Sequence, residues 1–238
     1  ALKNSGYSFP VSRITVNLAP ANLKKEGSQI DLPIAVGILS ANKVIEKNID
    51  ESTCIIGELS LDGKINAIDG ALPMVISMLS NNFKRIIIPE GNREECGSVN
   101  GIDVIPVENI RDLVNYFNGY RDIEPYIASY APSENIEIFQ EDFSEIKGQP
   151  AMKRAVEIAA AGMHNILLLG SPGSGKTMIA RRIPTILPDL TFEESLEVTK
   201  IYSISGMLNN KGLIRQRPFR SPHHTSSRVS MAGGGSKP

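Results

Sequence analysis

Alternation of apolar and polar positions predicts several strands and helices in the first 120 residues. Residues 13–18 alternate with period two, as a half-buried strand does, and residues 30–39 form a mostly apolar stretch with helical spacing. Residues 54–59 and 64–68 flank Asp62-Gly63, a dipeptide suited to the positive φ angles of a tight turn. This part of the pattern therefore predicts a strand, a helix and then a β-hairpin.

The same patterning continues to about residue 120 and then stops. It predicts a helix over 71–79, a buried strand over 85–88 that ends at Pro89, a strand at 104–105 and a helix over 110–117. Alternating strands and helices are typical of a compact α/β domain, which we place at residues 1–120. Residues 121–140 lack a clear period and predict a linker, so a second domain is expected at 141–238.

The second domain starts with a helix and an apolar segment. Residues 145–161 are rich in strong helix formers, and residues 166–169 read as a four-residue apolar strand. A helix over 178–183 is interrupted by Pro184 and Pro188. Thr191, followed by Glu193 and Glu194, is suited to begin the next helix.

Between the strand over 166–169 and the helix that follows lies the pattern GxxxxGK[ST]. Glycines in such a loop let backbone N–H groups approach phosphates, while the helix that follows presents its positive dipole end. Lys176 is expected to contact the β- and γ-phosphates, and the Thr177 hydroxyl to ligate Mg²⁺. We therefore expect ATP or GTP with Mg²⁺ as cofactors, bound by Gly170, Ser171, Pro172, Gly173, Ser174, Gly175, Lys176, Thr177 and Met178.

The cysteines and the apolar runs of the sequence bear on whether this is a metal-binding, disulfide-rich or membrane protein. Cys54 and Cys96 lie far apart without a CxxC pair, which excludes a zinc knuckle and a disulfide framework. No apolar run approaches the roughly 20 residues of a membrane span, and no signal-peptide pattern opens the chain. A cytoplasmic protein without a membrane partner is expected. Since the sequence opens without methionine and stops in a glycine-rich stretch, we expect it to be a fragment of a longer protein.

Charge is distributed unevenly, although the net charge is only −1. Residues 161–238 hold 10 Lys and Arg against 4 Asp and Glu, and no acid follows Glu197. Such a block is suited to a polyanionic partner, but like charges are also often solvated or balanced by acids elsewhere in the fold. Both interpretations stay open at this point.

The glycine loop is followed at a distance by Arg-Pro-Phe-Arg-Ser-Pro-His-His at 217–224 and preceded by Ala-Gly-Met-His-Asn at 161–165. Together with Gly-Gly-Gly-Ser at 233–236, these motifs resemble the magnesium-chelatase-like AAA+ family in order and spacing. The resemblance implies an ATPase that works as a ring, a hexamer, with ATP and Mg²⁺ as cofactors. In that family the acidic metal-binding strand, the sensors and the arginine finger follow later, so no catalytic residue is assigned here and this chain is not expected to suffice for hydrolysis.

The family also places residues 200–238 in an insert ahead of that acidic strand, near the central pore of related motors. The resemblance thus makes the acid-free block a candidate DNA interface, since Lys and Arg contact nucleic-acid phosphates. The candidate contacts are Lys200, Lys211, Arg215, Arg217, Arg220 and Arg228. The alternative is a structural role. His223 and His224 are adjacent and lack a nearby carboxylate or cysteine, which favours packing or hydrogen bonding over metal binding.

The first domain resembles the proteolytic domain of the Lon protease family. Residues 23–31 are similar to its nucleophile loop, and residues 57–64 and 86–89 to its hairpin and strand. Lon chemistry needs a serine nucleophile and a lysine base. The alignment places Gln29 and Leu72 at those positions and Ser28 one residue away, so the domain is expected to lack the catalytic dyad. The fold class is therefore α/β: a Lon-like α/β domain followed by the start of a P-loop AAA+ α/β domain.

Three functions remain. The leading hypothesis is an ATP-dependent DNA-remodelling motor, as in family members linked to branch migration during natural transformation. The main alternative is a chelatase-type motor that uses ATP to reshape a partner protein. The third is a binding module that holds nucleotide or nucleic acid without turnover.

Overall fold

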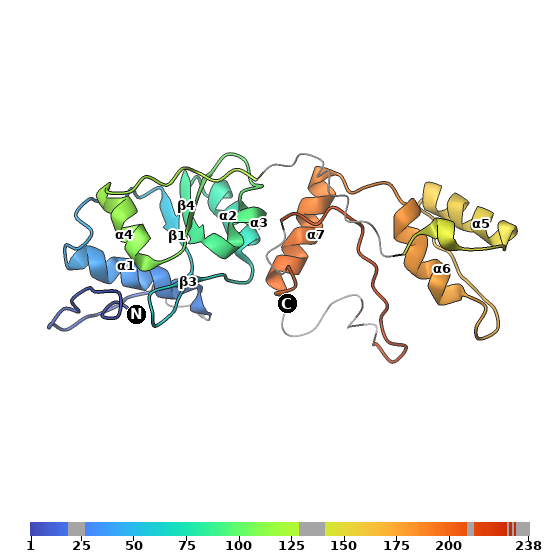
Figure 1. Ribbon diagram of the computed structural model, residues 1–238, viewed down its shortest axis with the longest axis horizontal. Helices are drawn as coiled ribbons and strands as arrows, with labels where there is room; N and C mark the ends of the chain where they lie inside the picture. The colour runs from blue at the N-terminus through green and yellow to red at the C-terminus, as the bar shows by residue number, and fades with distance from the viewer. Residues whose placement is uncertain (19–26, 129–140, 209–211, 228, 230, 232–238) are drawn as a thin grey trace. The chain divides into compact units, whose positions relative to one another are not determined.

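The computed structural model describes residues 1–238 except 19–26, 129–140, 209–211, 228, 230 and 232–238 (Figure 1). The contacts within the chain divide it into two units, residues 1–133 with 192–214, and residues 134–191 with 215–238. Each unit is described by itself.

A three-stranded parallel sheet forms the centre of the first unit. Its order is β1-β4-β5, with Ile86 opposite Cys54 on one side and Val104 on the other. The three central residues of β4 are isoleucines that are fully buried. A continuous apolar run of this kind is typical of a parallel strand that is covered on both faces. The strands are β1 (Thr53–Ile55), β4 (Arg85–Pro89) and β5 (Asp103–Val107).

Helices cover both faces of this sheet (Figure 1). Because successive strand residues point to opposite faces, Ile87 packs with α1 and α4, whereas Ile86 and Ile88 pack with α2 and α3. The helices are α1 (Asp31–Ala41), α2 (Ala71–Ser80), α3 (Arg93–Cys96) and α4 (Ile110–Asn118), with 3-10 turns η1 (Ser28–Ile30) and η2 (Glu90–Asn92). The mixed α/β class is confirmed.

The predicted hairpin is present but shorter than expected. Strands β2 (Glu58–Leu59) and β3 (Ile65–Asn66) pair antiparallel, and Gly63 in the turn has φ of 90°. The first residues of the predicted hairpin strand, Cys54 and Ile55, belong instead to β1 of the parallel sheet. A positive φ at Gly63 is the conformation that the Asp-Gly pair indicated.

The strand predicted over residues 13–18 is wrong. These residues form neither a helix nor a strand, and Val16 is 51% exposed. Period-two alternation shows only that a segment would fit a half-buried sheet, whereas a strand also needs a neighbour for its backbone N–H and C=O groups. No neighbouring strand pairs with this segment among the described residues.

The second unit is helical where it is described. Its elements are η3 (Phe143–Glu145), α5 (Pro150–Ala161), α6 (Lys176–Arg182) and η4 (Ile183–Ile186). Phe143, Ile146, Val156 and Ile179 form its core, against which Leu168 packs. The predicted helices on either side of the glycine loop are therefore confirmed.

The strand predicted over residues 166–169 does not form in the described residues. Leu167 and Leu169 are 79% and 83% exposed, while Leu168 packs on the core. A parallel strand between helices is stabilised by ladder hydrogen bonds to its neighbours. The described part of the second unit contains no other strand that could supply them.

Two segments group differently from the predicted domain limits, which remain a prediction. Residues 121–128, placed in the linker, lie on the first unit through bonds from Tyr126 N to Val104 O and from Ala128 N to Gly97 O. Helix α7 (Phe192–Ile204) also groups with the first unit. The rest of the predicted linker lies outside the described residues. In the part of the chain described, no helix is long and apolar enough to cross a membrane, and the cytoplasmic location stays a prediction.

Replacing Ile87 with alanine tests the covered sheet. Ile87 is fully buried, so Ile87→Ala should lower the free energy of unfolding of the first unit by about 2–5 kcal/mol. The control Val11→Ala removes an apolar side chain that is fully exposed and should change it by less than about 0.5 kcal/mol. Denaturant titration followed by circular dichroism measures both, and equal losses would contradict the packing described.

Candidate nucleotide-binding loop

The predicted glycine loop connects residues 164–169, which form neither a helix nor a strand, to helix α6. A turn closes it, with Ser174 N donating to Ser171 O at 3.3 Å. Gly173 and Gly175 have φ of 78° and 85°, a left-handed conformation that glycine adopts without strain. Nothing lies within 4 Å of the position that a Cβ would take at either glycine. The backbone of the loop is therefore open on that side.

Lys176 folds back over the loop. Its ammonium donates to Gly170 O at 2.9 Å, to Ser171 O at 2.7 Å and to the Ser174 hydroxyl at 3.2 Å. Gly170 leaves room for the Ser174 hydroxyl, because a Cβ at Gly170 would lie only 2.9 Å from Ser174 Oγ. The positive charge thus sits on the loop itself, where an anion bound by the loop amides would meet it.

The start of α6 adds unpaired N–H groups to the loop. Its first intrahelical hydrogen bond runs from Ile179 N to Gly175 O, so the amides of residues 176–178 lie at the open end of the helix. Thr177 and Met178 are exposed there. The structure therefore brings together Lys176, the Thr177 hydroxyl and an open glycine backbone. This donor set fits a phosphate chain with a hydrated Mg²⁺, which favours oxygen ligands.

Arg182, at the other end of α6, is a supporting residue that the sequence did not single out. Its guanidinium donates to Glu145 at 2.7 and 3.1 Å and to Glu141 at 3.3 Å, and its side chain is only 11% exposed. It also donates to Met178 O at 3.1 Å within its own helix. These bonds tie α6 to the segment before α5. Arg182 and its two glutamates lie almost forty residues apart in the chain. The sequence pattern therefore could not predict that they pair.

Gln149 is a second contact to the loop that the sequence did not indicate. Its side-chain amide donates to Ser174 O at 3.4 Å. The residue has φ of 52° and immediately precedes α5, which begins with Pro150. A glutamine before a helix has no distinctive spacing relative to the loop, so only the folded structure reveals this contact.

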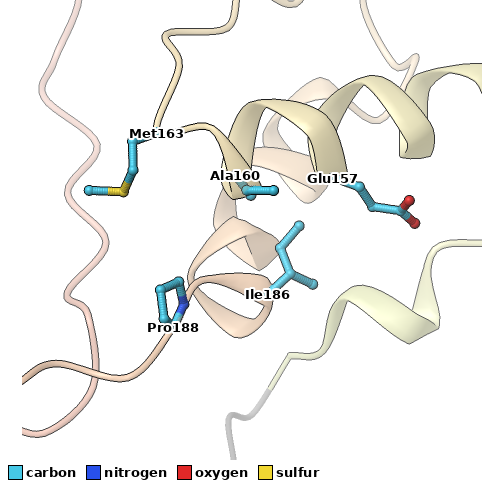
Figure 2. A pocket seen from close by; sticks show the side chains of 6 residues that line it. Glu157, Ala160, Met163, Ile186 and Pro188 are labelled. Carbon is cyan, nitrogen blue, oxygen red and sulfur yellow. The ribbon is translucent and has the colours of Figure 1, made fainter.

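A hollow of about 220 Å³ lies elsewhere in the same unit (Figure 2). Figure 2 shows Met163 and Pro188 on one side of it, with the Glu157 carboxylate pointing away from them. That carboxylate pairs with Arg154 at 3.2 Å. The lining residues are Glu157, Ala160, Ala161, Met163, Ile186 and Pro188. Because few polar groups converge on it, the hollow does not resemble a phosphate site.

The candidate DNA contacts are only partly described. Lys211 and Arg228 lie outside the described residues. Arg215 and Arg217 are half-buried and Arg220 is exposed, and Arg217 donates to Pro188 O at 2.7 Å. Lys200 pairs with Glu197 at 2.7 Å within α7. The arginines thus have protein partners as well as access to solvent.

The paired histidines are arranged for packing. Their rings lie 4.2 Å apart, and His223 Nδ1 is 2.7 Å from the Thr225 hydroxyl. No group of three His, Cys, Asp or Glu residues that could hold a metal ion occurs in the described ranges.

The two positions of the first unit that align with the Lon dyad hold neither a serine nor a lysine. Leu72 is fully buried in α2, and Gln29 lies in the turn η1. The Ser28 hydroxyl bonds to the Glu58 carboxylate and, together with the Asn66 amide, lowers the pKa of that carboxyl. A lowered pKa makes Glu58 a weaker base toward a hydroxyl. That the first unit lacks a catalytic dyad stays a prediction.

Family profiles match both parts of the chain. The family described as "Magnesium chelatase, subunit ChlI" matches residues 142–238, and that described as "Subunit ChlI of Mg-chelatase" matches residues 1–92. The glycine loop and the arginines at 215, 217 and 220 all lie within the match over residues 142–238.

Curated relatives match the chain along its whole length. YifB of Escherichia coli is 40% identical over all of this chain and 46% of its own length. Competence protein ComM of Haemophilus influenzae is 37% identical over all of this chain and 47% of its own length. The chain therefore spans about half the length of these relatives. Lon protease 2 of Bacillus subtilis is 28% identical over 97 residues, 40% of this chain and 17% of its own length.

Removing Arg182 tests the support of the loop helix. Arg182→Ala leaves Glu145 without its cation and should lower the free energy of unfolding of the second unit by about 2 kcal/mol. Arg154→Ala, which breaks an exposed pair with Glu157, should cost less than about 0.5 kcal/mol. Thermal unfolding followed by circular dichroism compares the two. An equal effect would show that Arg182 does not anchor α6.

Proposed function

Because the chain is a member of the magnesium-chelatase-like AAA+ family, we propose that it forms the nucleotide-binding part of an ATP-driven motor that remodels DNA. The observation that carries this proposal is the glycine loop, with Lys176 folded over it at the open end of α6. A loop of this kind binds the phosphates of a nucleotide through backbone amides and a lysine.

Each loop residue has a defined role in this proposal. Lys176, which donates to the Gly170 and Ser171 carbonyls, would contact the β- and γ-phosphates of ATP. The Thr177 hydroxyl would ligate Mg²⁺, which would neutralise part of the charge on the phosphates. The amides at the start of α6 hold the phosphate oxygens. Hydrolysis in the whole protein depends on further residues, namely an acid, sensors and an arginine finger, that the family places beyond residue 238.

DNA is proposed as the partner on the basis of charge and similarity. Arg215, Arg217 and Arg220 follow the last acid of the chain, and ComM is by name a competence protein. A cytoplasmic homo-hexameric ring that migrates DNA branches in transformation or recombination is the form that we propose for the whole protein. A chelatase-type motor acting on a protein is the alternative, which the names of the matching families favour. The Lon-like similarity of the first unit favours the ComM-like form.

Binding of ATP tests the loop directly. Lys176→Ala should weaken the affinity for Mg-ATP by at least about tenfold, because it removes a charge-assisted contact worth about 1.5–3 kcal/mol. The control Lys147→Ala removes an exposed lysine of the same unit and should leave the affinity unchanged. Isothermal titration calorimetry measures both. Equal affinity of Lys176→Ala and the parent protein would refute the proposed site.

Salt dependence tests the arginines in the full-length protein. Replacing Arg215, Arg217 and Arg220 together with alanine should reduce the slope of log K against log salt for duplex DNA by about 2–3. Replacing the same three with lysine should restore the slope. Removing Lys3, Lys43 and Lys84, exposed in the first unit, is the matched change in charge and should leave the slope intact. If both triple-alanine variants change the slope of log K against log salt equally, the arginines have a structural role instead.

A further inference from the structure

The carbonyl of Ser174, within the glycine loop, receives a hydrogen bond from outside the loop. The side-chain amide of Gln149 donates to Ser174 O at 3.4 Å. Two further bonds of Ser174 stay within the loop: its N–H donates to Ser171 O, and its hydroxyl accepts from Lys176 at 3.2 Å. Gln149 therefore supports the loop without involving Lys176, the residue that we assign to the phosphates.

The hydrogen bond from Gln149 bears on the direction of the Gly175 N–H. A trans peptide unit is planar, so the Ser174 carbonyl and the Gly175 N–H point in opposite directions. In the part of the chain that the structure describes, Gly175 N has no hydrogen-bond acceptor. With the carbonyl held by Gln149, the N–H lies on the opposite side of the peptide unit and is available to an oxygen of a ligand.

The peptide unit between Ser174 and Gly175 needs such support. Gly175 has φ of 85°, and nothing lies within 4 Å of the position that a Cβ would take there. Glycine adopts left-handed and right-handed conformations about equally, so its own backbone does not select one orientation of the peptide unit. The reverse orientation would present the partial negative charge of the Ser174 carbonyl to a phosphate. The bond from Gln149 opposes that orientation.

The segment before α5 holds Gln149 close to the loop. Ile146, three residues earlier, is 5% exposed and packs in the same core as Ile179 of α6. The ion pair between Arg182 and the preceding residue of this segment ties it to α6 a second time. Gln149 and Ser174 are thus kept near each other by contacts that neither of them makes.

The backbone of Gln149 is strained. Its φ of 52° and ψ of 53° are a left-handed conformation, which costs free energy in a residue with a Cβ. Glycine would adopt this conformation without that cost, so the backbone alone does not favour glutamine here. Strained residues cluster at functional sites. A side chain that reaches the loop gives a reason for glutamine at this position.

We propose that Gln149 is a positioning residue of the nucleotide site, whose amide holds the peptide unit between Ser174 and Gly175 with its N–H directed toward the phosphates of ATP. This inference rests on the proposed function, because it adds a residue to the same site. Gln149 acts through the loop backbone and does not itself contact the nucleotide. The Gly175 N–H then donates to a phosphate oxygen, in addition to the Lys176 ammonium.

Three substitutions of Gln149 test this role in calorimetric titrations with Mg-ATP at pH 8. Gln149→Ala removes the amide, Gln149→Gly also removes the left-handed strain, and Gln149→Glu keeps the shape but cannot donate when ionised. Each should weaken the affinity by at least about twofold to fivefold, as expected for one neutral hydrogen bond at the surface. Lys147→Ala, an exposed change in the same segment, is the matched control and should leave the affinity unchanged.

Nuclear magnetic resonance of the Gly175 amide separates positioning from a structural role. In the parent protein its proton resonance should move downfield when Mg-ATP binds, because a new hydrogen bond to phosphate deshields the proton. In Gln149→Gly and Gln149→Glu at saturating Mg-ATP it should move less. Gln149→Gly should unfold at a temperature no lower than that of the parent protein, since it relieves strain. Its loss of affinity then does not come from a loss of stability.

Parent-like affinity of Gln149→Gly and Gln149→Glu would overturn the positioning role. A Gly175 shift that equals that of the parent protein, in variants that bind weakly, would also overturn it, because Gln149 would then act elsewhere in the site. A Gln149→Gly protein that unfolds below the parent protein would assign the residue a structural role instead. If Lys176→Ala and the parent protein bind Mg-ATP equally, the proposed site itself fails. If Lys176→Ala loses affinity and the Gln149 variants do not, the loop remains the ATP site and only the positioning role fails.

Discussion

The Lys176 ammonium, held on the carbonyls of Gly170 and Ser171, is the interaction on which the candidate site depends. It fixes a positive charge on a backbone that the glycines leave open. A phosphate anion can replace these two neutral carbonyls as the acceptor for the Lys176 ammonium. Hydrogen bonds between a cation and an anion are stronger than those from the cation to a neutral acceptor. The loop therefore offers a positive charge and open backbone amides to the anion that we propose it binds.

The surroundings of the loop keep this arrangement in place. Ile179 anchors α6 in the small core of the second unit, and Arg182 ties the far end of the same helix to Glu145. Gln149 reaches the loop backbone from the start of α5. Helix α6 is thus held by the apolar packing of Ile179 and by polar contacts at both of its ends. Such support matters because a small core alone stabilises a unit of this size only weakly.

The sequence predicted those elements whose stabilising partners are near in the chain. The helices at 31–41, 71–80 and 110–118 and the hairpin turn at Gly63 follow from local spacing and turn chemistry. Residues 13–18 and 166–169 have strand-like patterns but no ladder partner among the described residues, and alternation cannot reveal that.

In the candidate site, too, the features formed by neighbouring residues could be predicted and those formed by distant residues could not. Its loop and Lys176 could be predicted because the motif is contiguous and its chemistry depends on spacing alone. The sequence could not predict that Arg182 pairs with Glu145, nor that α7 buries Ser195, Thr199 and Ser203. Both features depend on residues that are distant in sequence. A helix that buries hydroxyls and exposes isoleucines also violates the rule by which apolar positions are assigned to the core.

The central claim is that this chain belongs to a motor whose ATP site serves DNA remodelling. The most direct measurement is the rate of ATP hydrolysis by the full-length protein with and without branched DNA, at fixed salt concentration. We expect branched DNA to raise the rate several-fold above that with no DNA. An unchanged rate, in a preparation that hydrolyses ATP and binds the DNA, would contradict it.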